Sequence, residues 1–167
     1  MSHIAILGTL DTKRDEVFFM KDLIRGRGHA ATVVDVGPLG PPLSDPDISN
    51  EKVACAAGTE LRDLVQTPGR DRIMKAMGEG AARCLLERLK EGQLDGVIAI
   101  GGNQGTAIAS MAMGVLPIGF PKFMVSTVAS GNIRPYVGNK DIGMLFSVAD
   151  LVGGPNPVSR SILTNAV

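Results

Sequence analysis

The fold is decided by the first 36 residues, where HIAILGTLDTK at positions 3–13 and ATVVDV at positions 31–36 flank a helical segment. The apolar run that ends at Gly8 is short and continuous, which is typical of a strand buried on both faces. Thr12 is a candidate N-cap for the helix that follows. The apolar residues that then recur at helical spacing are Val17, Met20, Leu23 and Ile24. These features predict one βαβ unit.

The rest of the chain repeats this alternation of strand and helix. A long amphipathic helix is predicted over 71–91. Its apolar stripe consists of Ile73, Met77, Ala81, Cys84, Leu85 and Leu89. Further strands are predicted at 96–100, 122–126 and 143–148, and a helix of small residues at 106–113. We therefore expect a three-layer, Rossmann-like doubly wound α/β domain with a parallel sheet of about five strands in the flavodoxin-like order 2-1-3-4-5.

The segment 37–49 interrupts this alternation. It contains four prolines and two glycines, so we expect an irregular connection over the surface. Ser49 is then a candidate N-cap for a short helix that ends near Cys55 or Ala57.

Composition and charge exclude several classes of protein. The 167 residues carry 17 Lys and Arg against 17 Asp and Glu, so the formal net charge is zero. General affinity for nucleic acid or anionic lipid needs a basic surplus, and a membrane span needs roughly 18 consecutive apolar residues. We expect a single cytoplasmic domain over 1–167 that binds neither nucleic acid nor membrane. Cys55 and Cys84 are predicted to be buried, reduced thiols.

The strongest functional signal follows the third predicted strand, in the stretch Gly101-Gly102-Asn103-Gln104-Gly105-Thr106. Glycines between a buried strand and a helix leave no Cβ in the way of a phosphate. We expect the N–H groups of Gly105, Thr106 and Ala107 to face an anion, with the Thr106 hydroxyl as a cap or a phosphate contact. The stretch lacks the lysine of a Walker A loop and does not match G-x-G-x-x-G. A tight turn with close packing therefore remains the alternative.

The turn after the first strand, Gly8-Thr9-Leu10-Asp11-Thr12-Lys13, offers hydroxyls, a carboxylate and an amine. Asp11 can accept hydrogen bonds from ribose hydroxyls or hold Mg²⁺ through water, and Lys13 can neutralise phosphate charge. The alternative is that Asp11 or Thr12 only caps the helix and that Lys13 is solvated.

A third polar turn, Ser126-Thr127-Val128-Ala129-Ser130-Gly131, follows the fourth strand. Small hydroxyls ligate phosphate or sugar, although they also satisfy turn backbones locally. His3 and His29 do not lie at the carboxyl end of a strand, so histidine-based catalysis or metal binding is not expected. Because ligands of such sheets bind where the strands end, the three turns together predict a nucleotide or small-molecule site.

The chain resembles the Tm-1-like ATP-binding family, also called UPF0261. The resemblance rests on pieces that occur in the order found in that family. They are residues 8–13, Asp35-Val36-Gly37, the Gly-Gly-Asn-Gln-Gly-Thr stretch at 101–106, Pro121-Lys122, residues 124–131 and Ser147-Val148-Ala149-Asp150. Asn103 and Gln104 stand where the family more commonly has Ser and Gly, which makes this loop bulkier.

The resemblance implies that the chain is the first half of a module of about twice its length, completed by a second α/β subdomain. It also implies ATP binding with Mg²⁺, assembly as a homodimer and, in plant members, an antiviral role through binding a viral replication protein.

Three hypotheses for function follow. The first is a nucleotide-binding module in which the three polar turns hold the ligand. The second is an enzyme that acts on a small phosphorylated or carboxylated metabolite, with Asp11 as base or metal ligand and the glycine stretch as an oxyanion or phosphate cradle. The third is a non-catalytic interaction domain, in which the Pro-rich segment 37–46 and the apolar tail from Leu151 face a sister subunit or subdomain.

Overall fold

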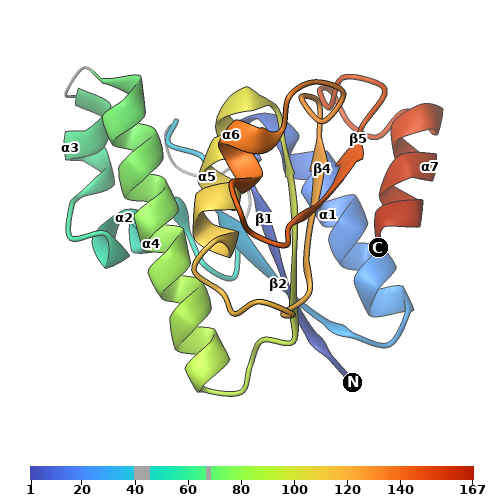
Figure 1. Cartoon of the computed structure of the whole chain (residues 1–167), viewed down its shortest axis with the longest axis horizontal. Coiled ribbons are helices and arrows are strands. Elements are labelled where there is room, and N and C mark those ends of the chain that lie inside the picture. Colours follow the sequence, from blue (N-terminus) through green and yellow to red (C-terminus); the bar gives the residue numbers. More distant parts are fainter. Residues whose placement is uncertain (40–45, 67–68) are drawn as a thin grey trace.

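The computed structural model describes residues 1–39, 46–66 and 69–167. Five strands form one parallel sheet in the order β2-β1-β3-β4-β5, which confirms the predicted architecture (Figure 1). The strands are β1 (His3–Gly8), β2 (Ala30–Asp35), β3 (Gly96–Gly101), β4 (Lys122–Ser126) and β5 (Gly143–Phe146).

Helices cover both faces of the sheet and complete the three layers (Figure 1). The helices of the described residues are α1 (Leu10–Gly26), α2 (Asn50–Ala56), α3 (Leu61–Gln66), α4 (Arg70–Lys90), α5 (Asn103–Met113), α6 (Arg134–Val137) and α7 (Pro157–Ala166). α1 and α7 lie on one face, and α2, α4 and α5 lie on the other. None of these described helices is long and apolar enough to cross a membrane.

The strands are continuously apolar because each face meets a helix layer. Ile6 and Ile98 point into the core beneath α1, whereas Ala5 and Ala99 point into the core beneath α4 and α5. Successive residues of a strand face opposite sides, so a strand covered on both sides needs an apolar residue at every position.

The long helix α4 confirms the prediction for this segment, including its apolar stripe. Met77, Ala81 and Leu85 are fully buried against the sheet and neighbouring helices. Gly80 allows α2 to approach closely, since a Cβ there would lie 1.9 Å from the backbone oxygen of Val53. Any side chain at this position would force the two helices apart.

The last strand is shorter than predicted, because β5 ends at Phe146 and not at 148. Ser147 still donates its N–H to the carbonyl oxygen of Ser126, at 3.1 Å. Val148 then takes a φ of 61°, a left-handed conformation that β-branched residues rarely adopt. The chain therefore turns away from the sheet immediately after Ser147.

The sequence pattern did not reveal α3, α6 or α7. A signal for α7 was present, since Asn156 is the N-cap and accepts hydrogen bonds from the N–H groups of Val158 and Ser159, and Pro157 occupies the first helical position. Leu163 of α7 is fully buried in the core beneath α1. Much of the apolar tail expected at an interface thus packs within this domain, and Val152 and Val158 are its exposed large residues.

Part of the connection after β2 protects the edge of the sheet. Residues 40–45 lie outside the described part of the chain. The predicted irregular connection over 37–49 can therefore be compared with the structure only at residues 37–39 and 46–49. Ile48 forms a parallel bridge with Val34, and the Asp47 carboxylate accepts hydrogen bonds from the Val33 N–H and from Lys21. These contacts satisfy the edge strand, which would otherwise present unpaired backbone groups.

The prediction for the two cysteines is half correct. Cys84 is buried within α4, and burial raises the pKa of its thiol. Cys55 is exposed, so the prediction that it is buried is wrong. α2 turns Val53 and Ala54 toward the core, and the next residue along a helix points in another direction. The Ser49 cap of this helix is confirmed, because its hydroxyl accepts the Lys52 N–H.

Candidate functional site at the carboxyl edge of the sheet

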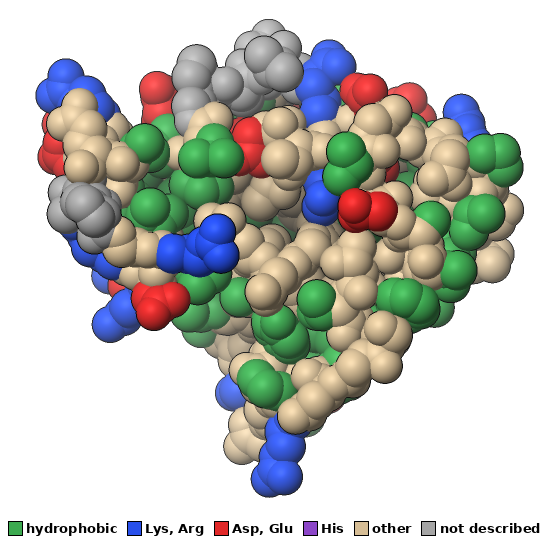
Figure 2. Space-filling view, turned by 90° about the horizontal axis from the view of Figure 1, so that it is seen from above, with side chains coloured by type: hydrophobic (Ala, Val, Ile, Leu, Met, Phe, Trp, Pro, Cys, Tyr) green, Lys and Arg blue, Asp and Glu red, His purple; other side chains and the backbone are tan. Residues whose placement is uncertain are grey.

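The carboxyl ends of β1, β3 and β4 lie side by side, because β3 pairs with both β1 and β4. The three polar turns that follow these strands therefore meet at one edge of the sheet. Figure 2 shows this edge from above. Acidic, basic and apolar side chains are interspersed over the described part of this face, with no continuous patch of one charge in view. Affinity for an anion here depends on individual N–H groups and individual cations.

The glycine-rich stretch forms the start of α5, three residues earlier than predicted. Gly102 is the N-cap, and the Thr106 N–H donates to the Gly102 carbonyl oxygen at 2.8 Å. The first N–H groups of a helix have no partner within it, so the outward-pointing groups are those of Asn103, Gln104 and Gly105. The prediction that the N–H groups of Thr106 and Ala107 face a ligand is wrong, because the helix uses them internally.

Thr106 and Ser126 lie beneath the site and join two of the turns. Both are fully buried, and their hydroxyl oxygens are 2.7 Å apart. The Ser126 hydroxyl also accepts the Val128 N–H at 3.1 Å, and the Thr127 N–H donates to the Gly101 carbonyl oxygen at 3.2 Å. In this structure the two hydroxyls fix the ends of β3 and β4 relative to each other and do not reach solvent.

The first turn is also shorter than predicted, because α1 begins at Leu10 with Thr9 as its N-cap. The prediction that Thr12 is the cap is wrong. The Leu10 N–H instead donates to the carboxylate of Asp35, at 3.1 Å. This contact replaces the side-chain cap that Thr9 does not supply. The Thr12 hydroxyl lies 3.0 Å from the Thr9 hydroxyl.

Asp35 lies behind the first turn, and the sequence pointed to it only through the family resemblance, with no role at the site. It ends β2, is 1% exposed, and accepts hydrogen bonds from the N–H groups of Leu10 and Gly37. Burial raises its pKa to about 6, against the two backbone hydrogen bonds, and the negative charge of Asp11 adds to the increase. An acidic residue at the end of an apolar strand was the available signal, since ligands bind where strands end.

Lys13 is not solvated, so the alternative expectation for this side chain is wrong. Its backbone is non-helical, with φ −131° and ψ 26°, and produces a kink in α1. The side chain is buried, and its Nζ donates to the Leu151 carbonyl oxygen at 2.9 Å. The ammonium thus lies within the protein, between the first turn and the segment after β5.

A cavity of about 190 Å³ lies between the first turn and the start of α5. Its lining residues are Thr9, Asp11, Thr12, Lys13, Pro38, Leu39, Gly102, Asn103, Gln104 and Gly105. Eight of these ten were predicted from the sequence, and Pro38 and Leu39 were not. Of the other predicted residues, Gly8 and Gly101 pack beneath the cavity with Thr106 and Ser126. Thr127, Ser130 and Gly131 do not line it.

Potential metal ligands are few at this edge. Among the described residues, no group of three or more His, Cys, Asp and Glu side chains is placed to hold a metal ion. Asp11 is the carboxylate that lines the cavity, and it accepts hydrogen bonds from the Thr12 hydroxyl at 3.2 Å and the Leu39 N–H at 3.4 Å. His29 is far from this edge, because it accepts a hydrogen bond from the Ser2 N–H at the start of the sheet.

The family model described as "Uncharacterised protein family (UPF0261) N-terminal domain" matches residues 2–167. The chain belongs to the UPF0261 family. Its site is therefore built from segments of a domain that this family shares.

The relatives include a UPF0261 protein of Clostridium tetani, 46% identical over 163 residues, which cover 98% of this chain and 40% of the relative. A UPF0261 protein of Rhizobium meliloti is 40% identical over 166 residues, which cover 99% of this chain and 40% of the relative. The ToMV susceptible protein tm-1(GCR26) of Solanum lycopersicum is 31% identical over 175 residues, which cover 96% of this chain and 23% of that protein. The chain thus spans about two fifths of the first of these relatives, and it is similar to a Tm-1 protein.

Proposed function

We propose that this domain binds the phosphate groups of ATP, together with Mg²⁺, in the cavity between the first turn and the start of α5. The outward N–H groups of Asn103, Gln104 and Gly105 would donate to phosphate oxygens at the positive end of the helix dipole. The resemblance to Tm-1-like proteins implies ATP as the ligand. A volume of about 190 Å³ suits phosphate groups and not a whole nucleotide.

The observation that carries this proposal is the presence of two glycines that packing does not require. A Cβ on Gly102 would meet only the Thr127 hydroxyl at 3.6 Å, and a Cβ on Gly105 would meet its nearest neighbour, the Ile100 carbonyl oxygen, at 3.6 Å. Neither glycine has a positive φ. Both line the cavity, so the missing side chains leave room for a ligand and not for the protein itself.

Gly101 shows the contrast, because a Cβ there would lie 2.8 Å from backbone atoms of Gly105 and Thr106. That glycine is required by the fold. A tight turn with close packing therefore explains the glycine at position 101. It does not explain the glycines at positions 102 and 105, which line the cavity.

Asp11 is the residue proposed to hold Mg²⁺. This ion keeps several waters and usually takes one or two protein carboxylates, with the remaining ligands from the substrate phosphates. A single lining carboxylate fits that mode of binding. Mg²⁺ would neutralise phosphate charge on the side of the cavity where the carboxylate lies, and Asp11 would orient the ion through its oxygens.

Titration calorimetry of the intact protein with ATP and MgCl₂ tests the proposal. Gly105→Ala is expected to weaken binding at least about tenfold, because the methyl group occupies space meant for phosphate, and to leave the unfolding temperature nearly unchanged. The control is Gly26→Ala at the end of α1, where a Cβ meets nothing within 4 Å. Equal affinities for Gly105→Ala and the unchanged protein, or no binding at millimolar ATP, would refute the proposal.

A further inference from the structure

Three lysines are buried in the described part of the chain, each 5–7% exposed, and two of them are paired with a carboxylate. Lys21 Nζ lies 2.9 Å from Asp47, and Lys122 Nζ lies 2.8 Å from Asp141. Lys13 has no carboxylate oxygen within 4.0 Å among the described residues, and its hydrogen bond goes to the neutral carbonyl of Leu151. Lys13 is thus the buried lysine of this part of the chain that lacks an ion pair.

A buried charge without a counter-ion is costly, so proteins rarely retain one without a function for it. Lys13 also lines the cavity whose opposite wall carries the outward N–H groups of α5. An anion in this cavity would supply the missing counter-ion. The ammonium therefore has two alternative partners, the carbonyl oxygen it contacts in this structure and the ligand.

The carbonyl partner belongs to a segment that crosses the start of α1. Residues 151–156, which we call the strap, lie between β5, which ends at Phe146, and α7, whose N-cap is Asn156. α1 holds the strap at two points, through Lys13 Nζ to the Leu151 carbonyl and through the Glu16 carboxylate, which accepts the Gly154 N–H at 3.1 Å. Gly153 lies between these two points and Gly154 lies at the second, and their φ values are 80° and 90°.

We infer that Lys13 is a switch that connects occupation of the cavity to the strap. Without an anion, the ammonium holds the strap against α1. With a phosphate group in the cavity, the ammonium turns to the phosphate oxygens, and the strap loses one of its two attachments to α1. This inference rests on the proposed function, because it assigns a consequence to phosphate binding at the same site.

The direction of the switch follows from the strength of the two hydrogen bonds. Both hydrogen bonds have a charged donor, but a phosphate also attracts the ammonium through its own negative charge, which the Leu151 carbonyl lacks, so a phosphate competes well with that carbonyl. Leu151 is 1% exposed, so its carbonyl must reach water to be released without a lasting cost. The adjacent Val152 is 63% exposed, so a small outward shift of the strap is enough to hydrate that carbonyl. The Glu16 contact is then the remaining one of these two attachments, so it opens more often and the Gly154 N–H exchanges faster, while the strap stays near α1.

Hydrogen exchange of the intact protein, followed by mass spectrometry of peptides that span residues 147–156, measures the strap directly. We expect the strap amides, including that of Gly154, to exchange about tenfold faster with saturating pyrophosphate or with ATP and MgCl₂ than without ligand. Peptides from α4, which does not contact the strap, should be unchanged or better protected.

Variants separate the switch from a general loosening of the protein. Lys13→Met keeps the volume of the side chain and removes the ammonium, so its strap should exchange fast without ligand and should not respond to pyrophosphate. Lys21→Met is the matched control, since Lys21 lies on the same helix with the same exposure but is paired with Asp47. Its strap should still respond. Lys13→Gln, which can still donate a hydrogen bond, serves if Lys13→Met does not fold.

The outcomes distinguish this inference from the proposed function. If calorimetry shows ATP binding while strap exchange stays constant or slows, the switch is refuted and the proposed function stands. If ATP does not bind but pyrophosphate speeds strap exchange through Lys13, the switch stands for a smaller phosphate ligand and the ATP proposal falls. If neither ligand changes the strap, or if the Lys13→Met strap exchanges like the wild-type strap, the switch is refuted.

Discussion

The larger of two cavities lies at the amino edge of the sheet, but the groups that can bind an anion lie at the carboxyl edge. At the amino edge, a cavity of about 430 Å³ is lined by the first residues of β1, β3 and β4, by the end of α1 and by the last residues of α7. At the carboxyl edge, the cavity is less than half as large. Yet the smaller cavity has the outward N–H groups of α5, a carboxylate and a buried ammonium without a counter-ion.

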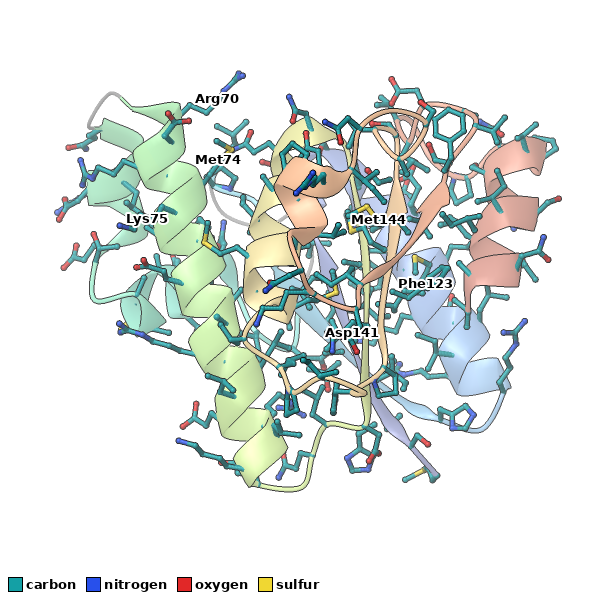
Figure 3. All side chains as sticks on the ribbon, in the orientation of Figure 1. Arg70, Met74, Lys75, Phe123, Asp141 and Met144 are labelled. Carbon is teal, nitrogen blue, oxygen red and sulfur yellow. The ribbon has the colours of Figure 1, made fainter. Side chains whose placement is uncertain are left out.

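The buried lysine at the amino edge already has a counter-ion. Lys122, at the start of β4, bonds the Asp141 carboxylate and the carbonyl oxygens of Pro117 and Phe120. Figure 3 shows Asp141 below Met144, before the start of β5. In a parallel sheet, helix N-termini meet the carboxyl ends of strands, and helix C-termini with their carbonyl groups meet the amino ends. The comparison teaches that the direction of the strands, and not the volume of a cavity, decides where anion-binding groups lie.

The largest expected effect compares two glycines at opposite ends of β3. Gly101→Ala should destabilise the protein by about 3 kcal/mol, because its Cβ would overlap backbone atoms that cannot move away. Gly96→Ala should cost less than about 1 kcal/mol, because its nearest contact is the end of the Ile4 side chain, at 3.2 Å. Urea unfolding measures both. Similar losses for the two variants would remove the distinction between a tightly packed carboxyl edge and a tolerant amino edge.

The second effect is an opposite pH dependence for one aspartate at each edge. Because the pKa of Asp35 is raised from 3.8 to about 6, its ionisation makes folding less favourable as pH rises from about 4 to about 6. Asp35→Asn should therefore gain stability over the wild type across that window, by an amount on the order of 3 kcal/mol between the two plateaus.

Asp141 provides the contrast, since the hydrogen bond from Lys122 lowers the pKa of its carboxyl group. Its contribution to stability is present above about pH 4 and is lost as pH falls below that value. Asp141→Asn should thus be less stable than the wild type at neutral pH and approach it in acid. Urea unfolding from pH 3 to pH 7 tests both variants, and a constant difference for Asp35→Asn would contradict its assignment as a buried acid.

A smaller effect concerns the buried hydroxyl pair beneath the carboxyl edge. Thr106→Val and Ser126→Ala should each cost about 1–2 kcal/mol, because each leaves the other hydroxyl without its partner. The double variant should cost less than the two single losses combined. A double-mutant cycle by urea unfolding measures this coupling, and strict additivity would show that the 2.7 Å contact contributes nothing.

The smallest effect is expected at Ser130, which the sequence placed in the site and the structure leaves exposed and away from the cavity. Ser130→Ala should change the unfolding free energy by less than about 0.5 kcal/mol and should not change ATP affinity in calorimetry. A clear loss of affinity would show that the ligand also contacts the turn after β4. It would weaken the assignment of the ligand to the cavity between the first turn and the start of α5.

The sequence by itself determined the parallel sheet, its strand order and the edge where polar turns gather. Apolar runs, helical periods and glycine positions are local properties, and right-handed crossovers leave few ways to connect them. Local patterns also placed α4 and the Ser49 cap correctly. They failed at the starts of α1 and α5, and for α1 the reason is the contact between the Leu10 N–H and the distant Asp35, which a local pattern does not show.

Only the tertiary structure decided the chemical state of the site. The partner of Lys13 is Leu151, 138 residues away, and the partner of Leu10 is Asp35, 25 residues away. Whether a lysine is solvated or buried, and whether an aspartate titrates near 4 or near 6, depends on such distant neighbours. Burial and hydrogen bonding are properties of the packed molecule, so the sequence could name the residues of this edge but not the roles that packing gives them.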